Sequence, residues 1–367
     1  MRAPTLFLAI LAVVSFSAAA RAEEDIPAYQ TLTCDRNCPS VIPARVIDAP
    51  LPAYPMRFEG YGGRVSDALV DVDFTIGTDG TVKNAVVEYL LGPQEFAERT
   101  LNAVNARRYQ PATEGGQAVE ESHRIRFTFR TGDGELGGRM GIVAAYQKAL
   151  ILVKQGKTAD AIAALREIAG RPELNFYERT MATYELATLY YQTGDYMDGR
   201  DMIRIATIGR GRFLDGASVD DAIRLRIRLE ALCGEFAEAF AWISVLRGRG
   251  VESDTERSVA DKMRGLIAGP DPLAAEARIP ADANPAFWQH TLLRRGFEFH
   301  EIVGKLDSFE LRCQHHGIRS AVSDKSSWTI PASWSGCFIN VTGTPGTKFT
   351  FVENAPAAGG TLRPAAP

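Results

Sequence analysis

A short phrase recurs three times in the middle of the chain, each time between two stretches with helical periodicity. The copies are residues 156–161 (GKTADA), 194–199 (GDYMDG) and 234–239 (GEFAEA). They recur at intervals of about 40 residues, and a fixed period of that size is typical of stacked helical hairpins. One hairpin cannot bury its own apolar face, so its neighbours must cover it. The sequence therefore predicts a helical array, a structure that usually holds another protein.

Apolar spacing predicts the individual helices of this array, which spans residues 141–267. The three hairpins pair 142–155 with 158–169, 177–192 with 196–208, and 218–233 with 236–246, and a helix over about 254–266 caps the stack. The array resembles tetratricopeptide repeats, lengthened by two loops, and this resemblance implies a groove that binds a peptide. A basic region is formed by the arginines at positions 204, 210, 212, 224, 226, 228, 247 and 249. It is either a solvated face or a site for an acidic peptide.

The first 22 residues predict export. Arg2 precedes an apolar run over residues 6–20, and Ala20-Arg-Ala22 forms a small-x-small cleavage site before three acidic residues. The run is shorter than the roughly 20 residues of a membrane-spanning helix. We therefore expect a cleaved signal peptide (1–22) and a periplasmic location. An uncleaved membrane anchor is the alternative.

Five cysteines in an exported chain are expected to form disulfides. Cys34 and Cys38 can close a small ring, and Cys313 and Cys337 flank a β-rich segment. The second bridge would close a loop of about 25 residues, which is worth roughly 3–4 kcal/mol by loop entropy. Cys233, at a helix end, has no partner in this pairing. It is either a buried free thiol or forms an intermolecular disulfide.

Residues 45–130, which follow a linker at 23–44, read as strand, strand, helix and strand. Alternating apolar residues over 70–76 predict a half-buried strand, and the glycines at 77–80 predict a hairpin to a second strand over 82–91. A helix and a closing strand follow. Several short motifs occur in order along this segment: Tyr54-Pro55, Gly63-Arg-Val65, Asp79-Gly80-Thr-Val82, Arg108-Tyr109-x-Pro111 and Phe127-x-Phe129.

This ordered set of motifs resembles the C-terminal domain of the TonB energy-transducer family. The chain departs from the family at Arg107, where a Trp is typical, and at Leu51, where a Gln can stand. The family's membrane anchor and long proline-rich spacer are absent. Because those two parts couple the inner-membrane motor to the outer membrane, the resemblance concerns the module that binds partners.

The resemblance implies that an extended segment of a partner adds a strand to the edge of this small sheet. We expect that edge to be the last strand, over 122–130, whose arginines could select acidic or C-terminal groups. The partners would be envelope proteins, with outer-membrane TonB-dependent receptors as candidates. The predicted partner-binding residues are Tyr54, Pro55, Arg124, Arg126, Phe127 and Arg130.

The C-terminal part predicts a small disulfide-linked β domain over 281–354. A Pro/Ala-rich linker (268–280) precedes it, and a disordered tail (355–367) follows. Cys313-Gln-His315-His316 also fits a metal site with His300 or Cys337 as a further ligand. Export favours the disulfide instead, so we expect no bound metal here.

The chemistry-bearing motifs of common enzymes are absent from the sequence, which contains no nucleophile elbow, phosphate-binding loop or His-Glu-x-x-His. A formal net charge of −4 argues against a nucleic-acid partner. We expect a multidomain α+β protein with no catalytic residues and no cofactor: a periplasmic TonB-like protein-binding adaptor linked to outer-membrane transport. Two alternatives are an energy transducer with an uncleaved anchor, and an envelope hydrolase or metal-binding protein.

Overall fold

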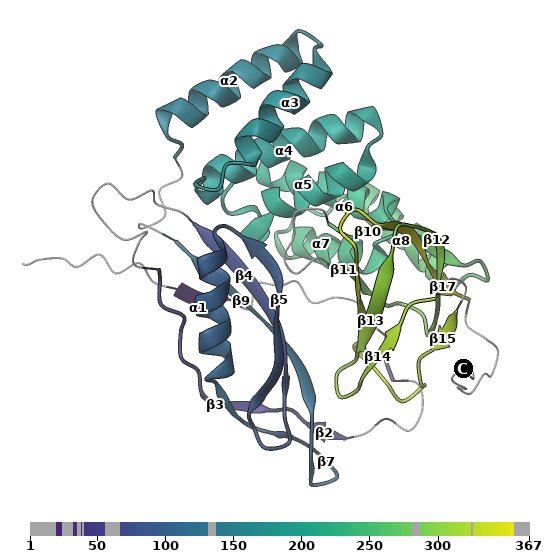
Figure 1. The fold of residues 1–367 in the computed structure, drawn as a ribbon. Helices are drawn as coiled ribbons and strands as arrows, with labels where there is room; N and C mark the ends of the chain where they lie inside the picture. Colours follow the sequence, from purple (N-terminus) through teal and green to yellow (C-terminus); the bar gives the residue numbers. More distant parts are fainter. Residues whose placement is uncertain are drawn as a thin grey trace, which may run out of the picture.

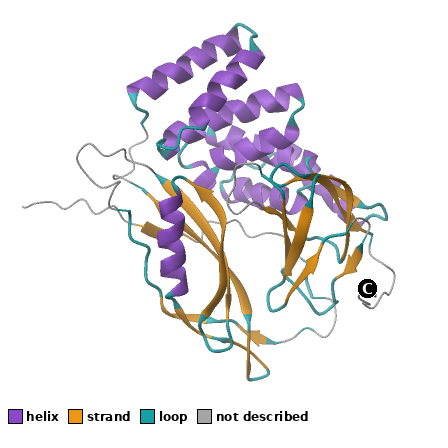
Figure 2. Cartoon of the chain, in the orientation of Figure 1, coloured by secondary structure: helices purple, strands orange, loops and turns teal. Residues whose placement is uncertain are grey.

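A computed structural model describes residues 20–23, 32–34, 38, 40–55, 67–130, 137–280, 287–323 and 326–355. The chain forms three modules: a front sheet with one helix, a helical array, and a second β structure near the C-terminus (Figures 1 and 2). Several predictions lie outside the described residues. They are the apolar run before residue 20, most of the predicted linker, the Gly63-Arg-Val65 motif and the tail beyond residue 355.

The front module is a four-stranded antiparallel sheet with the order β1-β9-β4-β5 and one helix, α1, on one face (Figure 1). Its main elements are β1 (Ala20–Glu23), β4 (Ala68–Ile76), β5 (Val82–Leu91), α1 (Gln94–Asn105) and β9 (Glu121–Phe129). Five short strands extend one end of it: β2 (Val41–Ile42), β3 (Arg45–Asp48), β6 (Arg108–Gln110), β7 (Ala112–Glu114) and β8 (Gln117–Val119). Aromatic residues dominate the core under the helix, as the alternating pattern predicted; among them Phe74, Phe96, Phe127 and Phe129 are fully buried.

Seven α-helices form the array, at the positions that periodicity predicted to within a few residues. They are α2 (Met140–Lys154), α3 (Thr158–Ala169), α4 (Phe176–Thr193), α5 (Tyr196–Ala206), α6 (Val219–Leu232), α7 (Phe236–Gly248) and α8 (Asp254–Ala268). A 3-10 turn, η2 (Ile208–Gly211), follows α5. The repeated phrase marks the turn inside each hairpin, where Gly156, Gly194 and Gly234 all have positive φ. The similarity of this arrangement to tetratricopeptide repeats remains a prediction.

The third module packs two antiparallel four-stranded sheets face to face. Their orders are β10-β17-β12-β15 and β11-β16-β13-β14. The strands are β10 (Leu273–Arg278), β11 (Phe287–Thr291), β12 (Gly296–Val303), β13 (Leu306–Arg312), β14 (Gly317–Ala321), β15 (Ser327–Thr329), β16 (Phe338–Gly343) and β17 (Lys348–Asn354). Four phenylalanines, Phe297, Phe299, Phe309 and Phe351, fill the space between the sheets. Strand β10 lies in the stretch that we predicted as a linker, so the module begins earlier than residue 281.

The array holds both β structures. On one side, Leu69 and Leu91 of the front sheet pack against Phe176 and Phe213 of the array. On the other side, Arg278 of β10 forms ion pairs with aspartates of α5, at 2.8 Å to Asp198 and 2.7 Å to Asp201. The helices therefore act as a frame that sets where the two β modules stand.

Two arginines of the basic region predicted on the array have an internal partner. Arg204 and Arg226 both pair with the fully buried Glu230, at 2.7 and 3.2 Å, and Arg226 also lies 4.2 Å from the centre of the Trp242 ring. These guanidinium groups hold helices together. Arg228, Arg247 and Arg249 of the same region are exposed, so the surface site for an acidic peptide stays a prediction.

Both predicted disulfides are present, Cys34–Cys38 and Cys313–Cys337, and Cys233 is a buried free cysteine. Replacing both Cys313 and Cys337 by alanine is expected to lower the free energy of unfolding by about 3.5 kcal/mol, against about 2 kcal/mol for the Cys34/Cys38 pair, because the larger loop restricts the unfolded chain more. Urea titration of the two double variants measures this difference. Equal losses, or a larger loss for the small ring, would contradict it.

Candidate partner-binding border

The sequence predicted that strand β9 is a free edge of the sheet. In the structure, β9 has a different strand along each of its two sides. On one side it pairs with β4 without any register shift, from Ala68↔Phe129 to Ile76↔Glu121. On the other side β1 pairs with four of its residues, from Ala20↔Phe129 to Glu23↔Arg126. The prediction of a free edge is therefore wrong for residues 126–129, where the strand is already flanked on both sides.

The backbone direction of β9 shows which groups meet β1. The N–H of Ser122 donates to the carbonyl oxygen of Gln314, in the third module, at 3.1 Å, so it points away from β4. Alternate residues of a strand direct their N–H and C=O groups to the same side. Residues 124, 126 and 128 therefore also point away from β4. Arg126 and Thr128 face β1, and Arg124 lies between β1 and the Gln314 contact.

The two central arginines of the predicted site are held by carboxylates of the same module. Arg124 makes a two-point ion pair with Asp73 at 2.6 and 3.0 Å, and Arg126 makes one with Asp71 at 2.7 and 2.6 Å. Arg124 also stacks on the ring of Phe338, 4.9 Å from its centre. The prediction that these guanidinium groups select acidic groups of a partner is wrong, because they neutralise the buried aspartates that alternate along β4.

Burial and charge set the protonation of this ion cluster. Burial alone would raise the pKa of Asp73, but Arg124 outweighs it and holds that pKa below its ordinary value. Burial raises the pKa of the neighbouring Glu88 well above its ordinary value, and the charges of Asp73 and Asp71 add to that effect against the opposing pull of Arg124. Glu88 thus tends toward the neutral acid beside the ionised Asp73.

The other predicted site residues lie inside the module or against the array. Tyr54 and Pro55 are buried, and the Tyr54 ring packs edge-on to Phe96 with centroids 5.1 Å apart. Phe127 is fully buried in the same core. The guanidinium of Arg130 lies 5.2 Å from the centre of the Phe213 ring of the array. These four residues position β9, and none of them offers a side chain to a partner beyond the border.

Sequence reasoning missed two features of this border. Residues 20–23 were read only as the end of a signal peptide, although a strand needs no more than a few extended residues with free backbone groups. The Gln314 contact comes from a loop almost 200 residues away, and no local pattern in the sequence points to it.

The alternative of a metal site at Cys313-Gln-His315-His316 loses two of its candidate ligands, since Cys313 and Cys337 are bonded to each other. The described part of the chain holds no cluster of three or more metal-ligating side chains.

One comparison with known proteins supports the resemblance of the front module. Residues 52–131 match the family model described as Gram-negative bacterial TonB protein C-terminal. This match and the two disulfides indicate a part in TonB-related transport and a place in the cell envelope. No helix among the described residues has both the length and the apolar character needed to span a membrane.

The other comparisons add little. No curated protein matches the chain. Among solved structures, the chain is similar to one titled "Phpd with cadmium complexed with hydroethylphosphonate (HEP)", with 13% identity over 92% of this chain and 79% of that one. The TM-score is 0.15, and a likeness of that size carries no argument about fold or function.

Proposed function

We propose that this chain is an exported, non-enzymatic adaptor of TonB-related transport, whose front module binds a partner by accepting one of its strands on β9. One observation carries the proposal: residues 20–23 already occupy that border as strand β1. The border therefore accommodates an added antiparallel strand with a regular register. Strand addition of this kind supplies affinity through main-chain hydrogen bonds.

The strand that fills the border is the one that export would remove. Cleavage after Ala22, the site that the sequence predicts, takes away three of the four residues of β1. The border with which Arg126 and Thr128 face β1 would then lose most of that strand. Open backbone groups at a sheet edge are a template for another chain, so the mature protein would be ready for a partner. Outer-membrane TonB-dependent receptors are the candidates that the family match favours.

An adaptor also needs a second surface. The array's inner hairpins are occupied by the two β modules, so the proposed second surface is the outermost hairpin, α2–α3. Two large apolar side chains of α2 are exposed there, Met140 at 90% and Ile151 at 53%. An amphipathic helix of a partner could cover such side chains, as in other helix-in-groove complexes.

Substitution of Thr128 tests strand addition on β9. In a chain that begins at Glu23, Thr128→Pro removes one outward N–H and leaves the bonds to β4 in place, since Thr128 points away from β4. We expect it to weaken binding of a synthetic peptide of residues 18–25, the stand-in for a partner strand, by more than about tenfold. Fluorescence anisotropy of the labelled peptide measures the change.

The matched variant is Thr128→Val, which keeps the N–H and the β-branched shape and is expected to bind like the parent chain. Circular dichroism of both variants checks that the fold is retained. If Thr128→Pro bound the peptide as tightly as Thr128→Val, strand addition at this border would be excluded. If the exported chain kept residues 1–22 and sedimented with membranes, the anchored transducer would replace the adaptor.

A further inference from the structure

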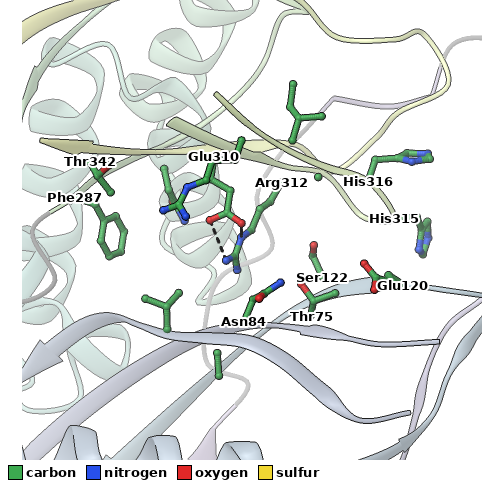
Figure 3. A pocket seen from close by; sticks show the side chains of 16 residues that line it. Thr75, Asn84, Glu120, Ser122, Phe287, Glu310, Arg312, His315, His316 and Thr342 are labelled. Atoms are coloured by element: carbon green, nitrogen blue, oxygen red, sulfur yellow. Dashed lines mark hydrogen bonds and ion pairs between the residues drawn. The ribbon is translucent and has the colours of Figure 1, made fainter. Parts of the chain in front are cut away.

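A second site of different character lies between the two β modules. A cleft of about 620 Å³ separates the front sheet from the β11-β16-β13-β14 sheet (Figure 3). Its volume is within the range of pockets that hold ligands, about 300–1,000 Å³. Both walls are formed mainly by strands and carry polar side chains. The two modules therefore face each other across a polar cleft instead of a packed apolar interface.

The wall from the third module carries more positive than negative charge. Strand register places Glu310 opposite Arg319 on β14 and two residues from Arg312 on its own strand, so all three side chains share one face. Figure 3 shows Glu310 and Arg312 side by side and joined to each other in the cleft. One carboxylate therefore shares this face with two guanidinium groups, and it pairs with that of Arg312.

Arg312 has an unused donor in this wall. Its side chain is buried, with 4% of the residue exposed. Nη2 donates to Glu310 at 3.1 Å, whereas Nη1 is buried and has no hydrogen-bond partner among the described residues. A buried guanidinium N–H without an acceptor is costly. A ligand with a negatively charged oxygen would remove that cost.

The opposite wall does not satisfy this donor. Asp71 and Asp73 of the front sheet are each held at two points by an arginine of β9, and no ion pair joins Arg312 to either of them within the part of the chain that the structure describes. Glu120, at the rim, pairs with Lys83 at 3.1 Å. The carboxylates near the cleft are thus paired with other cations. The charge of Arg312 also lowers the pKa of Asp73, but this attraction gives Nη1 no hydrogen-bond acceptor.

The cleft also exposes the border of a strand. Three consecutive residues of β14, from 317 to 319, line it; since alternate side chains point to opposite faces, the backbone itself must border the space. The N–H of Cys313 donates to the carbonyl of His316 across the hairpin turn, so these two residues face each other. By alternation the N–H and C=O groups of Gly317 and Arg319 point away from β13.

The facing strand of the front sheet is less suited to pairing. Asn84 of β5 has a positive φ of 51°, and the register of β5 against β4 shifts between Asp73 and Thr75. Such irregularities make the edge of a sheet less able to pair with another strand. Strand β14 has no register shift against β13, and on its other side it has no strand partner among the described residues.

We propose that this cleft binds an extended acidic peptide, which pairs with the border of β14 and places a carboxylate on Arg312 and Arg319. The backbone of β14 would supply the main-chain hydrogen bonds, and the two guanidinium groups would select the acidic side chain. The site is separate from the β9 border and does not depend on the function proposed for it. It would give the chain a third surface for a partner, beside the β9 border and the α2–α3 hairpin.

The test uses the full chain and acetylated, amidated nine-residue peptides of alternating valine and threonine with glutamate, glutamine or lysine at the centre. We expect the glutamate peptide to bind about tenfold more tightly than the lysine peptide, the preference that one charge-assisted contact supplies. The variants Arg312→Gln and Arg319→Gln should each reduce that preference at least threefold. Arg319 is exposed, so its variant keeps the proposal testable if Arg312→Gln fails to fold.

Arg264→Gln is the matched control, because Arg264 is an exposed arginine of α8 that pairs with Asp261 far from the cleft, and it should keep the full preference. N-methylation of alternate peptide residues should weaken binding at least tenfold by removing the strand's hydrogen bonds. Absence of binding by all three peptides, an unchanged preference in both arginine variants, or equal binding of the N-methylated peptide would each overturn the proposal. Displacement by free glutarate as effectively as by the glutamate peptide would do the same, since it would reduce the site to a small-anion pocket.

Discussion

His290→Gln is expected to lower the free energy of unfolding by about 3–5 kcal/mol, the usual cost of removing one partner from a buried ion pair. His290 of β11 is 3% exposed and lies between two carboxylates. Nδ1 is 2.8 Å from Glu235 at the start of α7, and Nε2 is 3.0 Å from Glu353 of β17. Without the imidazolium, two buried carboxylates would remain at the junction of the array and the third module.

The same group makes stability depend on pH. Burial alone would lower the pKa of His290, but Glu235 and Glu353 raise it to about 10. A histidine whose pKa is raised on folding contributes stability that is complete below its unfolded value, about 6.5, and is lost as the pH rises toward 10. Burial alone would raise the pKa of Glu235, but His290 and two arginines lower it to about 2, so its contribution is complete above about 4.5 and is lost as the pH falls toward 2.

Urea titration between pH 2 and pH 10 tests both statements. The parent chain should lose stability from about pH 6.5 upward, and His290→Gln should flatten that decline. The matched control is His300→Gln, because His300 pairs with Glu298 at a site where a third of its side chain is exposed. Such a surface pair is worth at most about 1 kcal/mol. Equal losses for the two variants would contradict the role assigned to His290.

Gly234→Ala is expected to lower the free energy of unfolding by roughly 3 kcal/mol. The alanine would have to adopt a left-handed backbone conformation, and its Cβ would overlap a neighbouring atom. Gly234 has a φ of 79°, and a Cβ there would lie 2.3 Å from the carbonyl oxygen of Ala274 in β10. That atom belongs to the backbone, so it cannot move aside without displacing the strand. The turn between α6 and α7 therefore fits against the third module only when its residue has no side chain.

The repeated phrase provides the control for this variant. Gly194 occupies the same place in the second copy with a φ of 84°, but nothing lies within 4 Å of a Cβ added there. Gly194→Ala should lower the free energy of unfolding by only about 1–2 kcal/mol, the cost of placing a residue with a Cβ in the left-handed conformation. Thermal unfolding of the two variants measures the difference. A cost for Gly194→Ala as large as that for Gly234→Ala would show that the Ala274 contact does not limit the turn.

Local pattern was sufficient for most of the elements. The three glycine phrases, with apolar residues at helical spacing around them, predicted the helices of the array because each helix has to bury one face. Alternation over residues 70–76 and 125–129 predicted β4 and β9, and the compartment predicted both disulfides. These features depend on interactions between residues that are close in sequence, or on the chemistry of cysteine alone.

Contacts between residues far apart in the sequence escaped prediction. Arg124 and Arg126 alternate with apolar residues on β9, and nothing in that pattern shows that Asp73 and Asp71 stand opposite them. Residues 20–23, which form β1, lie in the predicted export signal, and β10 lies in the Ala/Pro-rich stretch that was predicted to be a linker. The two walls of the cleft come from residues more than 160 positions apart. The sequence indicates which side chains must be buried. It does not indicate which residues, far away in the sequence, cover them.

Amide hydrogen exchange of Arg126 and Thr128 tests the central claim, that export opens a strand-binding border on β9. In the chain that still carries residues 1–22, these two amides should exchange slowly because β1 covers them. In the chain that begins at Glu23 they should exchange rapidly, and adding the peptide of residues 18–25 should restore their protection. Slow exchange of both amides in the shortened chain without any peptide would show that the border is closed, and the account would be wrong.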